Sequence, residues 1–203
     1  QVDSTVGKNL VDLKIVIKDD APNNAKQIYT IDDIIVYPNY SIIDSTYNAS
    51  EKVKTFKDFT IIDPENTFKP RVFDRTLYFA RGDVYNRSDH NLSLNRLVNL
   101  GTFKFVKNQF VVSDSLNHRL NVFYYLTPLT KKSFRVELLA KTNSANYTGS
   151  EVNINWSNRN TFKGAELLTI SAFGGMEVQV SGQNKGFNVY RIGGETSLVW
   201  PRF

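Results

Sequence analysis

The residues that could carry out chemistry in this chain are few and widely separated. Among its 203 residues there is no cysteine, and its two histidines, His90 and His118, lie too far apart to form a local metal-binding motif. The pairs Asp19–Asp20 and Asp32–Asp33 are adjacent carboxylates, and adjacent side chains on a strand point to opposite faces. The sequence also lacks the serine-hydrolase, phosphate-loop and zinc-protease motifs. We therefore predict that the protein is not an enzyme and holds no catalytic residue, metal or cofactor.

The charge and composition point to a folded protein that does not bind nucleic acid. The formal net charge is +5, with 41% hydrophobic and 22% charged residues. The basic residues are spread evenly, and their longest run is Lys131–Lys132. A nucleic-acid-binding surface normally gathers its basic residues, so we expect a solvated surface instead. No apolar run approaches the about 18 residues of a membrane helix, a test that does not detect membrane-spanning strands.

The elements that would position a site begin with a small α+β unit. Residues 39–69 show no clear periodicity, and we expect them to form an insertion on the surface of this unit. The order of strands and helices favours a mixed sheet with both helices on one face. The alternating segments predict strands over 10–20, 27–38, 102–114 and 118–128.

Two helices are expected between the second and third of these strands. Pro70 is placed to begin the first, which ends at Gly82. Ser88 is a suitable N-cap for the second, and Gly101 is placed for its C-terminal left-handed turn. The apolar spacing of the second helix predicts that it buries Leu94, Leu97 and Val98. Phe103, which opens the next strand, is expected in the same core.

Four long segments after Pro128 alternate between apolar residues on one face and mostly polar residues on the other. They cover 133–143, 149–160, 166–180 and 186–203. In the third, Thr169, Ser171, Glu177 and Gln179 are opposed by an apolar set formed by Leu168, Ile170, Ala172, Met176 and Val178. The glycine pair Gly174–Gly175 is more simply a bend or bulge in this strand than a phosphate cradle.

The alternation leaves two environments open for the apolar face. A soluble sandwich packs such faces against each other, whereas a membrane barrel turns them to lipid. The segments are longer than the about 5 to 6 residues usual for globular strands. Trp200 and Tyr190 lie toward opposite ends of one apolar face, as interfacial aromatic residues do. These features make lipid and protein about equally good explanations of the pattern alone.

The stretch ARGDVYNRSDHNLSLNRLVNLGTFKFVKNQFVV resembles a POTRA domain, the periplasmic module of outer-membrane β-barrel assembly proteins. The similar features are Gly82 with Tyr85, the helix end LVNLG, and Phe103 at the start of a strand. SNRNTFKGAELLTI resembles the turn of the family's second barrel hairpin, and WPRF the end of its fourth strand. Residues 39–69 and LTPLTKKSFRVEL are similar to the TamA-like, lipoprotein-type proteins of Bacteroidetes within the BamA/TamA superfamily.

The resemblance implies a domain organisation and a cellular location. Residues 1–20 would contain the last strand of a preceding POTRA domain, 27–128 a POTRA domain with the 39–69 insertion, and 133–203 the first four strands of an antiparallel transmembrane β-barrel. The barrel would lie in the outer membrane and the POTRA part in the periplasm. Four strands are fewer than the about sixteen expected of such a barrel, and residue 1 is glutamine. We therefore expect the chain to be part of a longer protein.

The resemblance also implies a function without covalent chemistry. The protein would insert or translocate outer-membrane proteins by pairing client strands with exposed edges, at the POTRA sheet and at the first barrel strand. Its partners would be outer-membrane lipids, unfolded client proteins and periplasmic or lipoprotein assembly subunits. Two alternatives remain open, a soluble periplasmic β-rich binding module and a two-partner-secretion-type transporter of the same superfamily. The residues of the candidate client-pairing strand are Phe134, Arg135, Val136, Glu137, Leu138, Leu139, Ala140 and Lys141.

Overall fold

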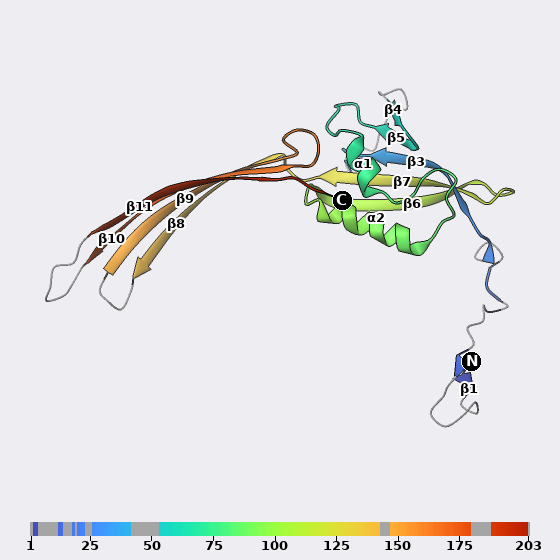
Figure 1. Cartoon of the computed structure of the whole chain (residues 1–203), viewed down its shortest axis with the longest axis horizontal. Coiled ribbons are helices and arrows are strands. Elements are labelled where there is room, and N and C mark those ends of the chain that lie inside the picture. The colour runs from blue at the N-terminus through green and yellow to red at the C-terminus, as the bar shows by residue number, and fades with distance from the viewer. Residues whose placement is uncertain are drawn as a thin grey trace.

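The computed structural model contains an α+β unit and a long curved sheet that extends from it (Figure 1). Hydrogen bonding organises the strands into a five-stranded sheet, a four-stranded sheet and a two-stranded pair. The structure describes residues 2–3, 12–13, 18, 20–22, 26–41, 53–142, 147–179 and 188–202.

The five-stranded sheet forms the centre of the α+β unit, in the order β4-β5-β3-β7-β6. β3 pairs in parallel with β5 and β7, whereas β6 and β4 are antiparallel to their neighbours. Alternate residues of β7 are buried, namely Leu120, Val122, Tyr124 and Leu126, as the period of a half-buried strand requires. The bounds are β3 Thr30–Tyr37, β4 Val53–Phe56, β5 Phe59–Ile62, β6 Phe103–Asp114 and β7 Arg119–Pro128.

Two helices pack against the face of the five-stranded sheet that holds the buried residues of β7, and they contribute to the same core. α1 is shorter than expected, Arg71–Thr76, because Leu77 already has an extended backbone. α2 spans Arg87–Asn99 and runs along β6 (Figure 1). Its N-cap is Asn86 rather than Ser88, since the Asn86 side chain accepts a hydrogen bond of 2.8 Å from the Asp89 N–H. Gly101 has a φ of 63°, the left-handed conformation expected beyond the helix end.

The residues predicted for the core of this unit differ in burial. Leu97 and Phe103 are buried, and Leu94 is partly buried against the same cluster. Val98 is 58% exposed, so its prediction as a core residue is wrong. The reason is geometric, because Val98 follows Leu97 by about 100° around the helix and only a narrow stripe of α2 touches the sheet.

Residues 39–69 are more than a surface insertion where the structure describes them. β5 adds to the edge of β3, and Phe59, Ile61 and Phe68 are buried in the core. The buried carboxylate of Asp63 accepts hydrogen bonds of 3.0 Å from the Thr67 hydroxyl and from the Phe68 N–H. The expectation of a surface excursion is therefore wrong for this part, while residues 42–52 lie outside the described residues.

The N-terminal segment is described only in short pieces. β1, Val2–Asp3, pairs antiparallel with β2, Asp12–Leu13. Most of the strand predicted over 10–20 lies outside the described residues. Its assignment to a preceding domain remains a prediction.

The second sheet contains the four alternating segments in the order β11-β10-β9-β8, and every pair is antiparallel. The described strands begin and end within a few residues of the predicted segments. The bounds are β8 Lys132–Thr142, β9 Tyr147–Arg159, β10 Leu167–Gln179 and β11 Val189–Val199. Within the described ranges, β8 and β11 each have one sheet neighbour, so this sheet is open at both edges.

Candidate lipid-facing sheet

Cross-strand register gathers the apolar residues of the four strands on one face. Directly paired residues in an antiparallel sheet project from the same face. One row across the sheet joins Phe134, Trp156 and Ile170, and the row below joins Val136, Ile154 and Ala172. A further row continues through Leu138, Val152, Gly174 and Ile192. Four separately alternating segments thus form one continuous apolar surface.

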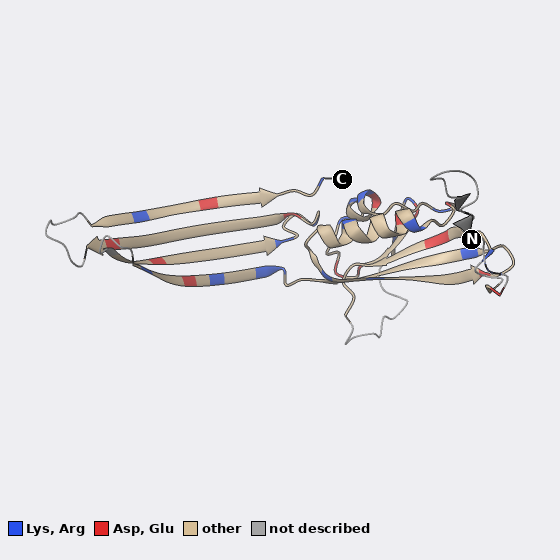
Figure 2. Cartoon of the chain, turned by 90° about the horizontal axis from the view of Figure 1, so that it is seen from below, with Lys and Arg blue, Asp and Glu red and all other residues tan. Residues whose placement is uncertain are grey.

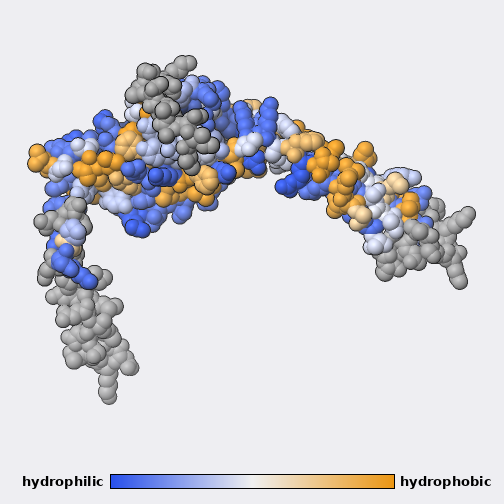
Figure 3. Space-filling view, turned by 180° about the vertical axis from the view of Figure 1, so that it is seen from behind, coloured by the Kyte–Doolittle hydropathy of each residue, from blue (hydrophilic) through white to orange (hydrophobic). Residues whose placement is uncertain are grey.

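This apolar face is exposed to its surroundings. Phe134 is 67% exposed, Leu138 79% and Ile192 92%, whereas core residues of the α+β unit are almost fully buried. The predicted lipid-facing residues of β10 all lie on this face, with Ile170, Ala172 and Met176 exposed and Leu168 and Val178 half-buried. Figure 3 shows hydrophobic residues gathered over the strands of this sheet. A contiguous apolar surface of this kind marks an interaction site.

The register places charges of both signs on the opposite face. Figure 2 marks the charged positions along these strands. Lys141 and Glu151 form an ion pair of 2.6 Å across β8 and β9. Arg191 pairs with Glu177 across β10 and β11, and Arg135 lies 3.5 Å from Glu137 along β8. Thr169, Ser171, Glu177 and Gln179 of β10 also lie on this face, as the alternation predicted. These exposed pairs contribute little stability in water, and they distinguish this charged face from the apolar one.

The glycines of this sheet keep it regular rather than interrupting it. Pairing with β9 runs through Gly174 and Gly175 without a register shift, so the bulge considered for this pair is absent. At Gly193 an added Cβ would come within 2.5 Å of the Phe173 ring. The Phe173 ring, which lies on the polar face, therefore covers this glycine from the neighbouring strand.

A tight turn fastens this sheet to the α+β unit. The turn between β9 and β10 contains Asn160, whose side-chain amide donates a 2.7 Å hydrogen bond to the Thr67 carbonyl. The Lys69 N–H donates a second bond of 2.7 Å to the Lys163 carbonyl. Ala165 of the turn is 3% exposed and belongs to the core cluster.

The inside of the turn is held by a buried carboxylate. Glu166 is 1% exposed and accepts hydrogen bonds from the N–H groups of Phe162 and Gly164, at 3.1 and 3.0 Å. The resemblance of SNRNTFKGAELLTI to a hairpin turn placed a turn here but did not identify Glu166 as its centre. The sequence carried no clear signal for this role, because the short side chains that usually bond to the backbone in turns are Ser, Thr, Asn and Asp rather than Glu.

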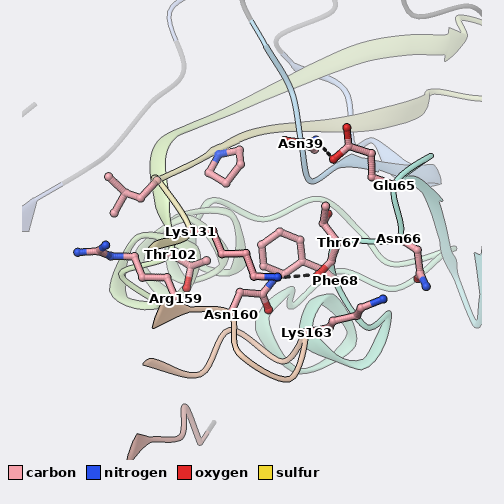
Figure 4. A pocket seen from close by; sticks show the side chains of 12 residues that line it. Asn39, Glu65, Asn66, Thr67, Phe68, Thr102, Lys131, Arg159, Asn160 and Lys163 are labelled. Carbon is pink, nitrogen blue, oxygen red and sulfur yellow. Dashed lines mark hydrogen bonds between the residues drawn. The ribbon is translucent and has the colours of Figure 1, made fainter. Parts of the chain in front are cut away.

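A cavity of about 460 Å³ lies at the junction beside this turn (Figure 4). Its lining comes from the loop before α1, from the β7–β8 connection and from the β9–β10 turn, and includes Thr67, Phe68, Lys131 and Arg159. The Arg159 guanidinium donates to the Thr130 carbonyl and the Ser133 hydroxyl, both at 3.3 Å. The arrangement can recognise polar groups but brings together no nucleophile and base.

The other predicted features of the site follow from the same geometry. The outer edge of β8 contains the candidate client-pairing residues, and every residue of this strand is exposed. In the described part of the chain, no group of three or more His, Asp and Glu residues could hold a metal ion. No helix among the described residues is long and apolar enough to cross a membrane.

Comparisons with known proteins find solved structures that are similar to this chain, CdiB and BamA among them. No protein-family model matches the chain. No curated protein matches its sequence. CdiB from Acinetobacter baumannii is similar with 14% identity and a TM-score of 0.49, over 73% of this chain and 22% of that one. BamA from Haemophilus ducreyi lacking POTRA domains 1–3 is similar with 12% identity and a TM-score of 0.37, over 84% of this chain and 47% of that one. The chain thus spans less than half the length of either structure, and likenesses this distant do not by themselves assign a function.

Proposed function

We propose that the four-stranded sheet is part of an outer-membrane β-barrel and that residues 27–128 form the periplasmic POTRA domain next to it. The observation that carries this proposal is the exposed apolar face, which four strands build in register opposite a charged face. A membrane barrel requires this division, with lipid outside and water inside. The resemblance of residues 80–112 to a POTRA domain supports the same assignment.

The strand lengths fit a bilayer. β9 and β10 each contain 13 residues, and at about 3.3 Å per residue such a strand extends about 43 Å. Tilted by about 45°, it crosses about 30 Å, the thickness of the hydrocarbon core. β8 and β11 contain 11 residues each, which is within the about 9 to 11 residues that a tilted barrel strand needs to cross the bilayer.

The proposed activity is assembly or translocation of other outer-membrane proteins by strand pairing. β8 presents an unpaired outer edge in the described sheet, and β6 is an edge strand of the five-stranded sheet. An extended client segment can add to either edge through backbone hydrogen bonds. We propose further that the partners are client proteins, outer-membrane lipids and periplasmic subunits. The proposal also includes membership of the TamA-like subtype of Bacteroidetes and the role of β8 in pairing with clients.

A two-partner-secretion-type transporter is the second candidate, because it would use the same sheet and the same periplasmic unit. The two functions differ in the client: an assembly factor templates membrane strands, whereas a transporter passes one secreted chain. A soluble binding module is the third candidate. In such a module, other parts of the protein or a partner protein would pack against the apolar face.

Cysteine labelling tests the proposal, since the chain has no cysteine of its own. Single cysteines that replace Ile170 or Ser171 place a thiol on the apolar face or on the polar face, at neighbouring positions of the same strand. In outer membranes that contain the protein, a lipid-soluble thiol reagent should label position 170 and a water-soluble one position 171. Protection of position 170 from both reagents would mean that protein covers the face, which contradicts the barrel and supports the soluble module.

A further inference from the structure

A second, smaller cavity lies at the other side of the junction and is rich in cations. Its volume is about 210 Å³, and it is formed by α1, by Lys69 just before that helix, by the β9–β10 turn and by the segment after β11. The residues that line it are Lys69, Arg71, Val72, Arg75, Gly164, Glu166, Trp200 and Pro201.

The positive charges of Lys69, Arg71 and Arg75 are not balanced by Glu166, which is the carboxylate that lines the same cavity. Among the described residues, no ion pair involves the side chains of Lys69, Arg71 or Arg75, and all three residues are exposed. Glu166 turns its carboxylate toward the N–H groups of its own turn and is buried. The cavity therefore favours an anion, and two arginines suit a phosphate because a guanidinium can bind two of its oxygens at once.

Trp200, which lines the cavity, indicates the level at which this anion would sit. Trp200 stacks on Phe162 with ring centres 6.3 Å apart, and both side chains remain at least half exposed. Trp200 follows Leu198 by two residues, and Leu198 pairs with Leu168 on the apolar face. Exposed tryptophan beside cations at the end of an apolar strand face is typical of the level of lipid headgroups.

We infer that this cavity binds the phosphate of an anionic phospholipid in the periplasmic leaflet, with Arg71 and Arg75 as the principal contacts. The inference rests on the proposed function, because the apolar face sets the depth of the cavity relative to the bilayer. Contact with a headgroup would hold the α+β unit at a fixed angle below the membrane.

The test compares binding of the whole chain to phosphatidylglycerol-containing vesicles with binding to vesicles of phosphatidylcholine alone. The double variant Arg71→Gln/Arg75→Gln should lose most of the preference for phosphatidylglycerol, about fivefold per cation and about 25-fold in all. The matched control is Arg87→Gln/Lys107→Gln. It removes the same charge from α2 and β6, outside the cavity, and should retain the preference. Thermal unfolding of both variants monitors the fold.

The outcomes separate this inference from the proposed function. An unchanged preference in the cavity variant, or an equal loss in the control variant, would overturn the phospholipid site. The lipid-facing sheet would still stand in that case if the protein binds to vesicles of both compositions. If inorganic phosphate binds the chain in calorimetry and the cavity variant loses this binding, while the unaltered chain shows no preference for phosphatidylglycerol, the cavity binds a soluble phosphate and the lipid assignment is wrong. Failure to bind phosphatidylcholine vesicles would instead contradict the lipid-facing sheet itself.

Discussion

Arginine scanning of the apolar face of β10 measures how deep each position lies in the bilayer. Ala172 is one residue from Phe173, the middle of the 13-residue strand, and it faces outward between Ile154 and Gly194. Leu168 lies on the same face but four residues nearer the α+β unit. In a strand tilted by about 45° this separation brings Leu168 about 9 Å closer to the membrane boundary.

The expected costs follow from this depth. Ala172→Arg should lower the free energy of unfolding by about 2–4 kcal/mol, as for an arginine at the bilayer midplane. Ile170→Arg should cost less, and Leu168→Arg about 0–1 kcal/mol near the interface. Ser171→Arg is the matched control on the opposite face. It adds the same charge beside Glu195, its cross-strand neighbour, where water and an opposite charge accept it.

The assay is urea unfolding of the membrane-assembled protein in lipid vesicles, with the four variants compared under one condition. The reasoning is refuted if Leu168→Arg costs as much as Ala172→Arg, since a protein core penalises charge without regard to depth. It is also refuted if Ser171→Arg is as harmful as Ala172→Arg, because the two faces would then be equally dry.

Further predictions concern the α+β unit and the junction. Leu97→Ala should lower the free energy of unfolding by about 2–5 kcal/mol because it leaves a cavity in the core, while Val98→Ala, at an exposed position, should change it by less than about 0.5 kcal/mol in the same denaturant titration. Burial lowers the pKa of His90, so the folded state binds fewer protons than the unfolded state and stability falls as the pH drops below about 6.5; His90→Gln should reduce this slope in unfolding curves at about pH 7.5 and pH 5.5. Asn160→Ala should cost about 1–3 kcal/mol, since it leaves the Thr67 carbonyl without its donor, and hydrogen exchange should then rise at the Lys69 N–H. Deleting residues 53–69 should abolish the cooperative unfolding transition, and a retained transition would restore the view of a dispensable insertion.

Local pattern was enough to predict most elements of the fold. Alternation located the four long strands to within a few residues, because a period of two follows directly from strand geometry. It also separated Ile170 from Ser171 correctly as members of opposite faces. Helix ends were less well predicted. Asn86 and Ser88 are both good N-caps, and only the closing of the Asn86 hydrogen bond to Asp89 decides between them.

What the sequence could not supply depends on contacts between distant residues. Parallel pairing of β5 with β3 places Phe59 and Ile61 in the core, although their segment shows no period of its own. Asn160 reaches Thr67 across 93 positions of the chain, and the cation-lined cavity beside Trp200 exists only where three separate segments meet. The sequence by itself determined that one face of each strand is apolar, because side-chain direction is a local property. Tertiary structure alone decided that the four faces join in register and that the turn binds the α+β unit, because pairing and docking are set by the summed packing of residues far apart in the chain.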